Sequence, residues 1–203
     1  MDDNKNKLID LNTGIIDLSR KPANKAMSKI YVMRQKYSSI LSASVKSAAE
    51  FIDLNIPQKT QIRIITTKSF NALSAIDLIA RSSQIDEIYI SVYAMNQAST
   101  DWLLSFFRDN AKTAGKIVLA SFFQQTKRYQ GWCENLIASK SDNLVVKFDR
   151  IHAKVFIAKT RDGRHFILEG SGNLSGNARI EQYIFENNEE VYNFHKKWMD
   201  DIT

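Results

Sequence analysis

The chain contains little cysteine, proline or glycine. Its 203 residues include 1 Cys, 2 Pro and 7 Gly. A single cysteine, Cys133, excludes an internal disulfide framework and a cysteine-based zinc cluster, and it agrees with a reducing compartment. The scarcity of proline and glycine, together with 44% hydrophobic residues, predicts a globular chain that buries a substantial core.

Long apolar segments are also missing. No stretch of the sequence approaches the roughly 18 apolar residues that a membrane-spanning helix needs. Residues 1–7 are charged and polar with no apolar stretch, so they do not resemble a secretory signal. We therefore expect a cytoplasmic protein with no membrane partner.

The net charge of +6 is unevenly distributed along the chain. Between residues 112 and 164 the sequence has eleven Lys or Arg and four Asp or Glu, and towards the C-terminal end the sign reverses. A basic segment attracts polyanions through counterion release, which favours nucleic acid, DNA or RNA, as the partner. A solvated surface is the alternative. Lys127 and Arg128 are candidate substrate-binding residues, while Tyr129 and Trp132 either stack on bases or belong to the core.

The hydrophobic pattern predicts an α/β fold. Before Pro57, apolar residues recur at helical spacing from Ile30 to Phe51, which predicts a long amphipathic helix, and Ile9–Leu18 could add a short strand. After Pro57, strands and helices alternate, which predicts a mixed β-sheet flanked by helices on both faces. We expect an N-terminal helical appendage over residues 1–57 and a catalytic domain over residues 58–203.

The expected elements after Pro57 can be given by residue range. Strands are predicted at 62–67, 87–93, 116–121, 144–148, 164–169 and 182–185, with a further strand that carries His152. Helices are predicted at 71–81, 99–114 and 127–139, with a short helix after residue 173 and a last helix near the C-terminal end.

An ordered set of polar residues between positions 151 and 181 suggests a chemistry. His152 and Lys154 lie two residues apart, so on a strand they would project from the same face while Val155 and Ile157 face a core. Beyond a predicted turn, the run Gly170-Ser171-Gly172-Asn173 offers small residues, backbone N–H groups and an amide that could receive a phosphate. Glu181 follows. The combination points to phosphodiester chemistry.

These residue types suit nucleophilic attack on phosphorus. A neutral imidazole can attack, and a second imidazole can protonate the leaving oxygen. A carboxylate such as Glu181 could fix the ring tautomer, while Lys154 and Asn173 bind the equatorial oxygens, so neither metal nor cofactor is required in principle. Taken singly, His152 could be structural, Glu181 a solvated charge, and Ser171 or Asn173 a helix cap.

The order His-x-Lys, Gly-Ser-x-Asn and Glu resembles the active-site signature of the phospholipase D superfamily, over roughly residues 60 to 201. The resemblance implies that His152 is a nucleophile that forms a phosphohistidine. It implies that Lys154 and Asn173 bind phosphate, that Glu181 orients the ring and that Ser171 supports the site. Gly170 and Gly172 would complete the substrate-binding loop.

Two positions depart from that signature or leave a choice. The family pattern places an Asp where this chain has Lys159, which puts the local packing in doubt more than the nucleophile. Glu186 follows Glu181 at a spacing that could also match the acidic partner, and we prefer Glu181.

The chain supplies one motif, although the two-step mechanism needs two imidazoles. His165 and His195 lack the neighbouring motif residues, and we expect both on the surface. The resemblance therefore implies a homodimer in which two copies of His152 meet across a twofold axis. The leading functional hypothesis is a metal-independent nuclease. One alternative is a catalytically silent protein that binds nucleic acid or has a regulatory role. The other is a phospholipid hydrolase or transferase.

Overall fold

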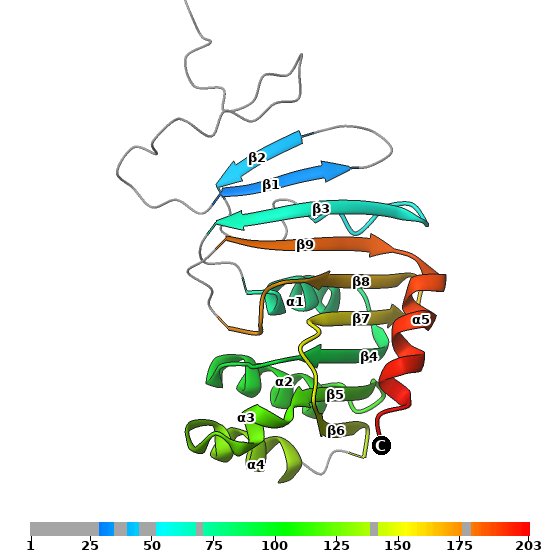
Figure 1. Ribbon diagram of the computed structural model, residues 1–203. Coiled ribbons are helices and arrows are strands. Elements are labelled where there is room, and N and C mark those ends of the chain that lie inside the picture. Colours follow the sequence, from blue (N-terminus) through cyan, green and yellow to red (C-terminus); the bar gives the residue numbers. More distant parts are fainter. Residues whose placement is uncertain (1–28, 35–39, 45–51, 68–70, 139–141, 176–179) are drawn as a thin grey trace, which may run out of the picture.

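One mixed β-sheet forms the centre of the molecule. The computed structural model describes residues 29–34, 40–44, 52–67, 71–138, 142–175 and 180–203. Nine strands of this described part join in the order β2-β1-β3-β9-β8-β7-β4-β5-β6 (Figure 1). Their bounds are β1 Lys29–Arg34, β2 Ile40–Ser44, β3 Thr60–Thr67, β4 Ile85–Val92, β5 Ala114–Ala120, β6 Leu144–Asp149, β7 Val155–Thr160, β8 His165–Gly170 and β9 Ile180–Asn187.

The strands β4, β5 and β6 are parallel, and every other pairing between two of the nine strands is antiparallel. The parallel strands need crossover connections, and helices supply them. The helices are α1 Leu73–Ser82, α2 Gln97–Asp109, α3 Ser121–Gln125 and α4 Gln130–Ala138, with a 3₁₀ turn η2 at Lys127–Tyr129 and a final α5 at Glu189–Asp200. The predicted α/β architecture is confirmed.

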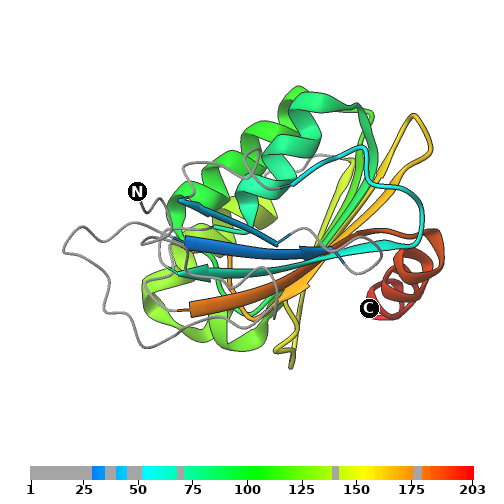
Figure 2. The ribbon, with the colours of Figure 1, turned by 90° about the horizontal axis from the view of Figure 1, so that it is seen from above.

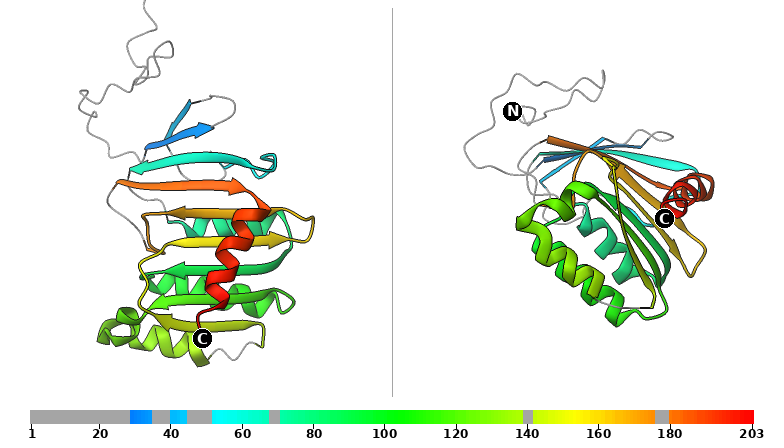
Figure 3. Two further views of the ribbon diagram at one scale, coloured as in Figure 1. Left: turned by 45° about the vertical axis from the view of Figure 1, so that its right-hand side comes forward. Right: turned by 60° about the horizontal axis from the view of Figure 1, so that its bottom comes forward.

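Helices cover both faces of the sheet. Figures 2 and 3 show α1, α2 and α4 on one face and α5 alone on the other. The strand β7 is buried on both sides, because Phe156 and Ala158 join the larger core under α1 and α2 while Val155 and Ile157 join a smaller one under α5. The alternation follows from the two-residue period of a strand. It corrects the prediction that β7 has one apolar face and one functional face.

The prediction of a long helix between Ile30 and Phe51 is wrong for the part of that segment that the structure describes. Residues 29–34 and 40–44 are strands, and β1 pairs antiparallel with both β2 and β3. Ile30, Tyr31 and Val32 are β-branched or aromatic residues, which favour strands, and the open edge of β3 supplies a pairing partner. The strand predicted at Ile9–Leu18 lies outside the described residues, as does the greater part of the short helix predicted after residue 173.

Two smaller differences concern the segments around β5. The helix predicted to run to Ala114 ends at Asp109, and Ala114 already begins β5. Asn110 caps this end, since its Nδ2 donates to the Phe106 carbonyl at 2.8 Å. The short helix α3, which starts directly after β5, was not predicted. Its Phe123 is fully buried and anchors it to the core.

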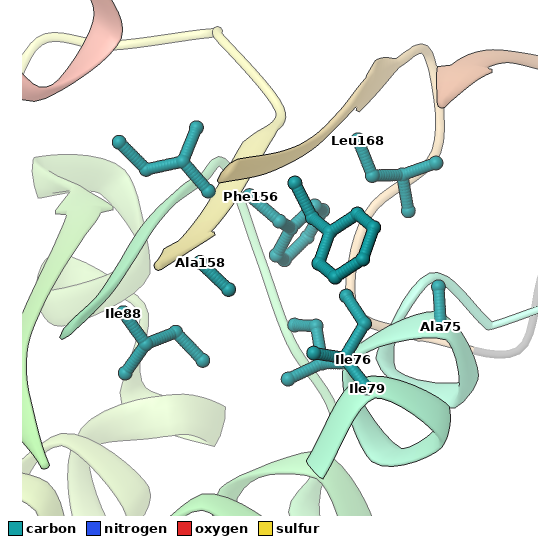
Figure 4. A pocket seen from close by; sticks show the side chains of 9 residues that line it. Ala75, Ile76, Ile79, Ile88, Phe156, Ala158 and Leu168 are labelled. Atoms are coloured by element: carbon teal, nitrogen blue, oxygen red, sulfur yellow. The ribbon is translucent and has the colours of Figure 1, made fainter. Parts of the chain in front are cut away.

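A small pocket lies in the core beneath α1. It is lined by apolar residues of α1, β4, β7 and β8, including Ile76, Phe156 and Leu168 (Figure 4). No polar side chain reaches it, so it belongs to the packing of the core and offers no group for chemistry.

Candidate active site

The strands β4 to β9 each have one end on the same side of the sheet, which we call the site edge. The parallel strands β4, β5 and β6 all finish there. Because β7 runs antiparallel to β4, with Val155 opposite Ser91, β7 begins at the same edge. The next two antiparallel pairings bring the end of β8 and the start of β9 to it as well. In Figure 1 this edge lies on the left of the sheet.

His152 and Lys154 lie in the connection between β6 and β7, just outside the strand on which they were predicted. They nevertheless come together. Lys154 Nζ is 3.2 Å from His152 Nδ1, 3.3 Å from His152 Nε2 and 2.8 Å from the His152 carbonyl oxygen. The imidazole is exposed, whereas Lys154 is only 6% exposed. The nucleophile candidate thus faces solvent with a buried cation beside it.

Burial affects the charge of Lys154. Loss of solvent lowers the pKa of the Lys154 ammonium, and the negative charge of Glu181 partly offsets this by raising it. A desolvated cation interacts more strongly with an incoming anion than an exposed one does, because little water screens it. The arrangement therefore suits the binding of a phosphate oxygen at Lys154.

Glu181, at the start of β9, contacts the glycine-serine loop. Its Oε2 accepts a hydrogen bond from Ser171 Oγ, which in turn accepts one from the backbone N–H of Gln182 at 3.0 Å. We predicted that Glu181 orients the ring of His152. The carboxylate instead binds Ser171 and acts electrostatically on Lys154, while the ring nitrogens of His152 contact Lys154.

The backbone of the Gly170–Asn173 loop is largely committed to the fold. The N–H of Gly170 donates to the Lys154 carbonyl at 3.1 Å, and that of Ser171 donates to the Gln182 carbonyl at 3.0 Å. A Cβ on Gly170 would come within 2.2 Å of the same Gln182 oxygen, so glycine permits the close approach of the two strands. Gly172 is buried. A phosphate would therefore bind side chains of this site rather than the backbone N–H groups of Gly170 and Ser171.

Asn173 is held by the segment that follows β4. Its Oδ1 accepts a hydrogen bond from the backbone N–H of Ala94 at 3.3 Å, and the next residue, Leu174, donates its N–H to the Ala94 carbonyl at 3.2 Å. An amide whose oxygen is bound to a donor presents its NH₂ group elsewhere. Asn173 can therefore donate to an anion, as its predicted role requires.

Two aromatic residues at this edge were missed in the sequence. Tyr93, directly after β4, lies with its ring centroid 5.0 Å from that of His152, and Lys154 Nζ is 5.6 Å from the Tyr93 centroid. Phe122 of α3 stacks on Tyr93 at 5.5 Å with an interplanar angle of 12°. The sequence could have indicated them only by their positions. Each residue follows the end of a parallel strand, where ligands of open α/β sheets bind.

The prediction that His165 and His195 lie on the surface is wrong, since both are buried. His195 in α5 contacts Glu169 Oε2 through Nε2 at 3.3 Å and accepts a hydrogen bond from Trp198 Nε1 at 3.1 Å. His165 lies at the far end of β8 from the site and packs edge-on against Tyr192. The hairpin beside His165 and the lysines that follow His195 suggested exposure, but docking of α5 on the sheet buries both rings.

The other candidates can be placed. Glu186, the alternative acidic residue, is buried near the far end of β9 and accepts from Asn188, so it lies away from His152. Lys159 is also near the far end, on β7, with its Nζ 3.8 Å from Glu87 Oε1. The departure from the family pattern thus falls outside the group around His152.

The predicted substrate-binding pair lies on η2. Lys127 is exposed there, and the side chain of Arg128 is outside the described residues. Tyr129 and Trp132 pack against Phe123 at 4.7 and 6.2 Å between centroids, which supports the core interpretation of these two rings. Over the described ranges, no three His, Cys, Asp or Glu side chains gather as metal ligands. Likewise, no helix described there has the length and apolar character to cross a bilayer.

Comparison with known proteins identifies the fold. No protein-family model and no curated protein sequence matches the chain. Among solved structures, the chain is similar to Nuc from Salmonella typhimurium, a phospholipase D family member, with 15% identity and a TM-score of 0.50 over 69% of this chain and 93% of that one. The protein therefore has a phospholipase D-like fold, as its motif order predicted.

Two larger proteins also resemble the chain. A polyphosphate kinase from Porphyromonas gingivalis matches with 11% identity and a TM-score of 0.51 over 86% of this chain, but the chain spans only 26% of that protein. Phosphatidylserine synthase from Haemophilus influenzae Rd KW20 matches with 14% identity and a TM-score of 0.47, over 70% of this chain and 38% of that one.

Proposed function

We propose that the protein is a metal-independent phosphodiesterase that cleaves nucleic acid through a phosphohistidine on His152. One observation carries the proposal: the ammonium of the buried Lys154 lies beside the exposed imidazole of His152 at the strand edge of a phospholipase D-like fold. A nucleophile and a phosphate-binding cation are thereby within reach of one phosphate group.

The reaction proceeds in two steps. An imidazole nitrogen of His152 attacks phosphorus, the P–N bond forms, and the bond to the leaving oxygen breaks as an acid protonates that oxygen. Water then attacks the phosphohistidine, loses a proton to the same acid–base group and releases the free ring. Lys154 and the Asn173 amide stabilise the negative charge on the equatorial oxygens, and Glu181 favours the charged form of Lys154.

The acid–base group comes from a second copy of the chain in this proposal. His195 is buried with both ring nitrogens engaged, and His165 lies near the opposite end of the sheet. Neither can protonate a leaving oxygen at His152. A twofold homodimer that brings two copies of His152 together supplies the missing imidazole.

Basic residues support nucleic acid as the substrate. Lys127 on η2 and Arg150 directly after β6 are exposed, and both follow strands that end at the site edge. A polyanion would gain from contacts with both, because each phosphate neutralised releases a counterion.

The test is cleavage of labelled DNA and RNA in excess EDTA by wild type and His152→Ala, with Ala153→Ser as a control at an exposed neighbour. We expect the wild type and the control to cut, and His152→Ala to be inactive. We also expect a labelled fragment to remain covalently attached to denatured wild type and not to His152→Ala. Cleavage by His152→Ala would overturn the nucleophile assignment. Salt-sensitive binding without cleavage by wild type would point to a binding protein instead.

A further inference from the structure

We propose that Phe122, backed by Tyr93, is a stacking platform for an unpaired nucleobase within a few nucleotides of the scissile phosphate. The inference rests on the proposed function and deepens it by naming single-stranded nucleic acid as the substrate class. Its basis is that Tyr93 contacts His152 and the exposed Phe122 stacks on Tyr93.

The geometry of the pair fits a base-stacking role. Phe122 is 51% exposed although its neighbour Phe123 is fully buried. One face of Phe122 stacks on Tyr93 at 5.5 Å, and Tyr93 lies 5.0 Å from His152. Nucleotides of one strand follow each other at about 3.4 Å along a duplex axis, so the platform lies within a few nucleotides of the reacting phosphate.

The platform is held rigidly. Phe123 stacks on Tyr129 at 4.7 Å with an interplanar angle of 10°, which fixes α3 to the core. The carbonyl of Phe122 accepts hydrogen bonds from Thr126 Oγ1 at 2.8 Å and from the Thr126 N–H at 3.0 Å. A ring that is already ordered loses little conformational entropy when a base stacks on it.

Charge favours a nucleic-acid strand as the occupant. The register places Ala120 opposite Asp149, so Phe122 and Arg150 follow the ends of adjacent strands. Lys127 is exposed five residues beyond Phe122. Exposed aromatic rings together with basic residues are the usual composition of a single-strand binding groove. In a duplex both faces of each base are already stacked, so the platform selects an unpaired strand.

The experiment compares two labelled strands that carry the same phosphates, one with bases and one with abasic sugars throughout. Cleavage of both is measured with wild type, Phe122→Ala, Phe122→Trp and Phe194→Ala. The last is a control, because Phe194 is 66% exposed on α5. Stacking of one base predicts that wild type prefers the base-bearing strand by about 5- to 150-fold.

We expect Phe122→Ala to lose this preference, and Phe122→Trp and Phe194→Ala to keep it. The proposal is overturned if wild type cuts both strands equally well, or if Phe122→Ala retains the full preference. If wild type cuts neither strand, the proposed nuclease function fails. The same four proteins then test the platform by fluorescence anisotropy of the two strands, with the same preference expected in the dissociation constants.

Discussion

Lys154 Nζ lies 3.2 and 3.3 Å from the two ring nitrogens of His152. An ammonium carries only hydrogen-bond donors, so it can bind an oxygen of an incoming phosphate. Its position beside the ring leaves Lys154 close enough to contact the phosphate that His152 attacks.

Replacing Lys154 should remove most of the activity. We expect Lys154→Met to lower kcat about 10²- to 10³-fold, because one preorganised group that stabilises transition-state charge is lost. Lys159→Met is the matched control, since Lys159 lies near the far end of β7, and it should retain activity. Steady-state kinetics on a labelled oligonucleotide decide the matter. Equal losses in the two variants would contradict the role of Lys154.

Glu181 should control the alkaline limb of the pH–rate profile. Burial lowers the pKa of Lys154, and Glu181 raises it, so the ammonium loses its proton at lower pH without that carboxylate. Because binding needs the charged form, Glu181→Gln should shift the alkaline fall in kcat/KM to lower pH. Glu189→Gln, at an exposed position of α5, should leave the profile unchanged. An unshifted limb in Glu181→Gln would refute the coupling.

Two glycines should respond in opposite ways to alanine. A Cβ at Gly170 would meet Gln182 O at 2.2 Å and Tyr183 Cδ1 at 2.6 Å, whereas at Gly131 it meets nothing within 4 Å. We expect Gly170→Ala to destabilise the protein by about 1–3 kcal/mol. Gly131→Ala, in α4, should stabilise it by about 0.4–1 kcal/mol. Urea unfolding measures both. A neutral Gly170→Ala would show that β8 and β9 separate easily.

The buried Glu186 should limit stability at neutral pH. Burial raises its pKa above the unfolded value, and nearby Glu169 adds to the rise. Ionisation of Glu186 therefore costs more free energy in the folded state than in the unfolded state. Below the unfolded pKa the protonated carboxyl contributes its full stability, and this contribution is lost as pH rises through the folded pKa. Glu186→Gln should raise Tm relative to wild type at about pH 7 and by less at about pH 4. The exposed Glu134→Gln should show neither effect. A gain in Tm independent of pH would argue against the ionisation cost.

Mixing active and inactive chains should reveal the composite site. If each active centre needs His152 from two copies, only dimers of two wild-type chains turn over. A coexpressed equal mixture with His152→Ala should therefore have about a quarter of the wild-type activity, because a random mixture forms that fraction of such dimers. Activity of one half would indicate independent sites. Sedimentation as a monomer at the assay concentration would exclude the dimer.

The amino-acid sequence determined the chemical groups and the broad architecture. The alternation of strands and helices after Pro57 could be predicted from the sequence, because the hydrophobic periods of both elements are visible within short segments of the chain. The order His152, Lys154, Asn173 and Glu181 likewise needed no tertiary structure to suggest phosphodiester chemistry. These predictions depend on residue type and spacing, which the chain carries directly.

Tertiary structure decided which groups meet. Residues 29–34 form a strand because they pair with the free edge of β3, and residues 40–44 form a strand because they pair with residues 29–34 in turn. A local window of sequence does not contain these partners. His195 is buried because α5 docks on the sheet, and Glu181 contacts Ser171 because the register of β8 and β9 brings their ends together. Tyr93 and Phe122 stand far apart in sequence, and only the common edge of β4 and β5 places them beside His152. Sequence specified the groups, and long-range strand pairing set their geometry.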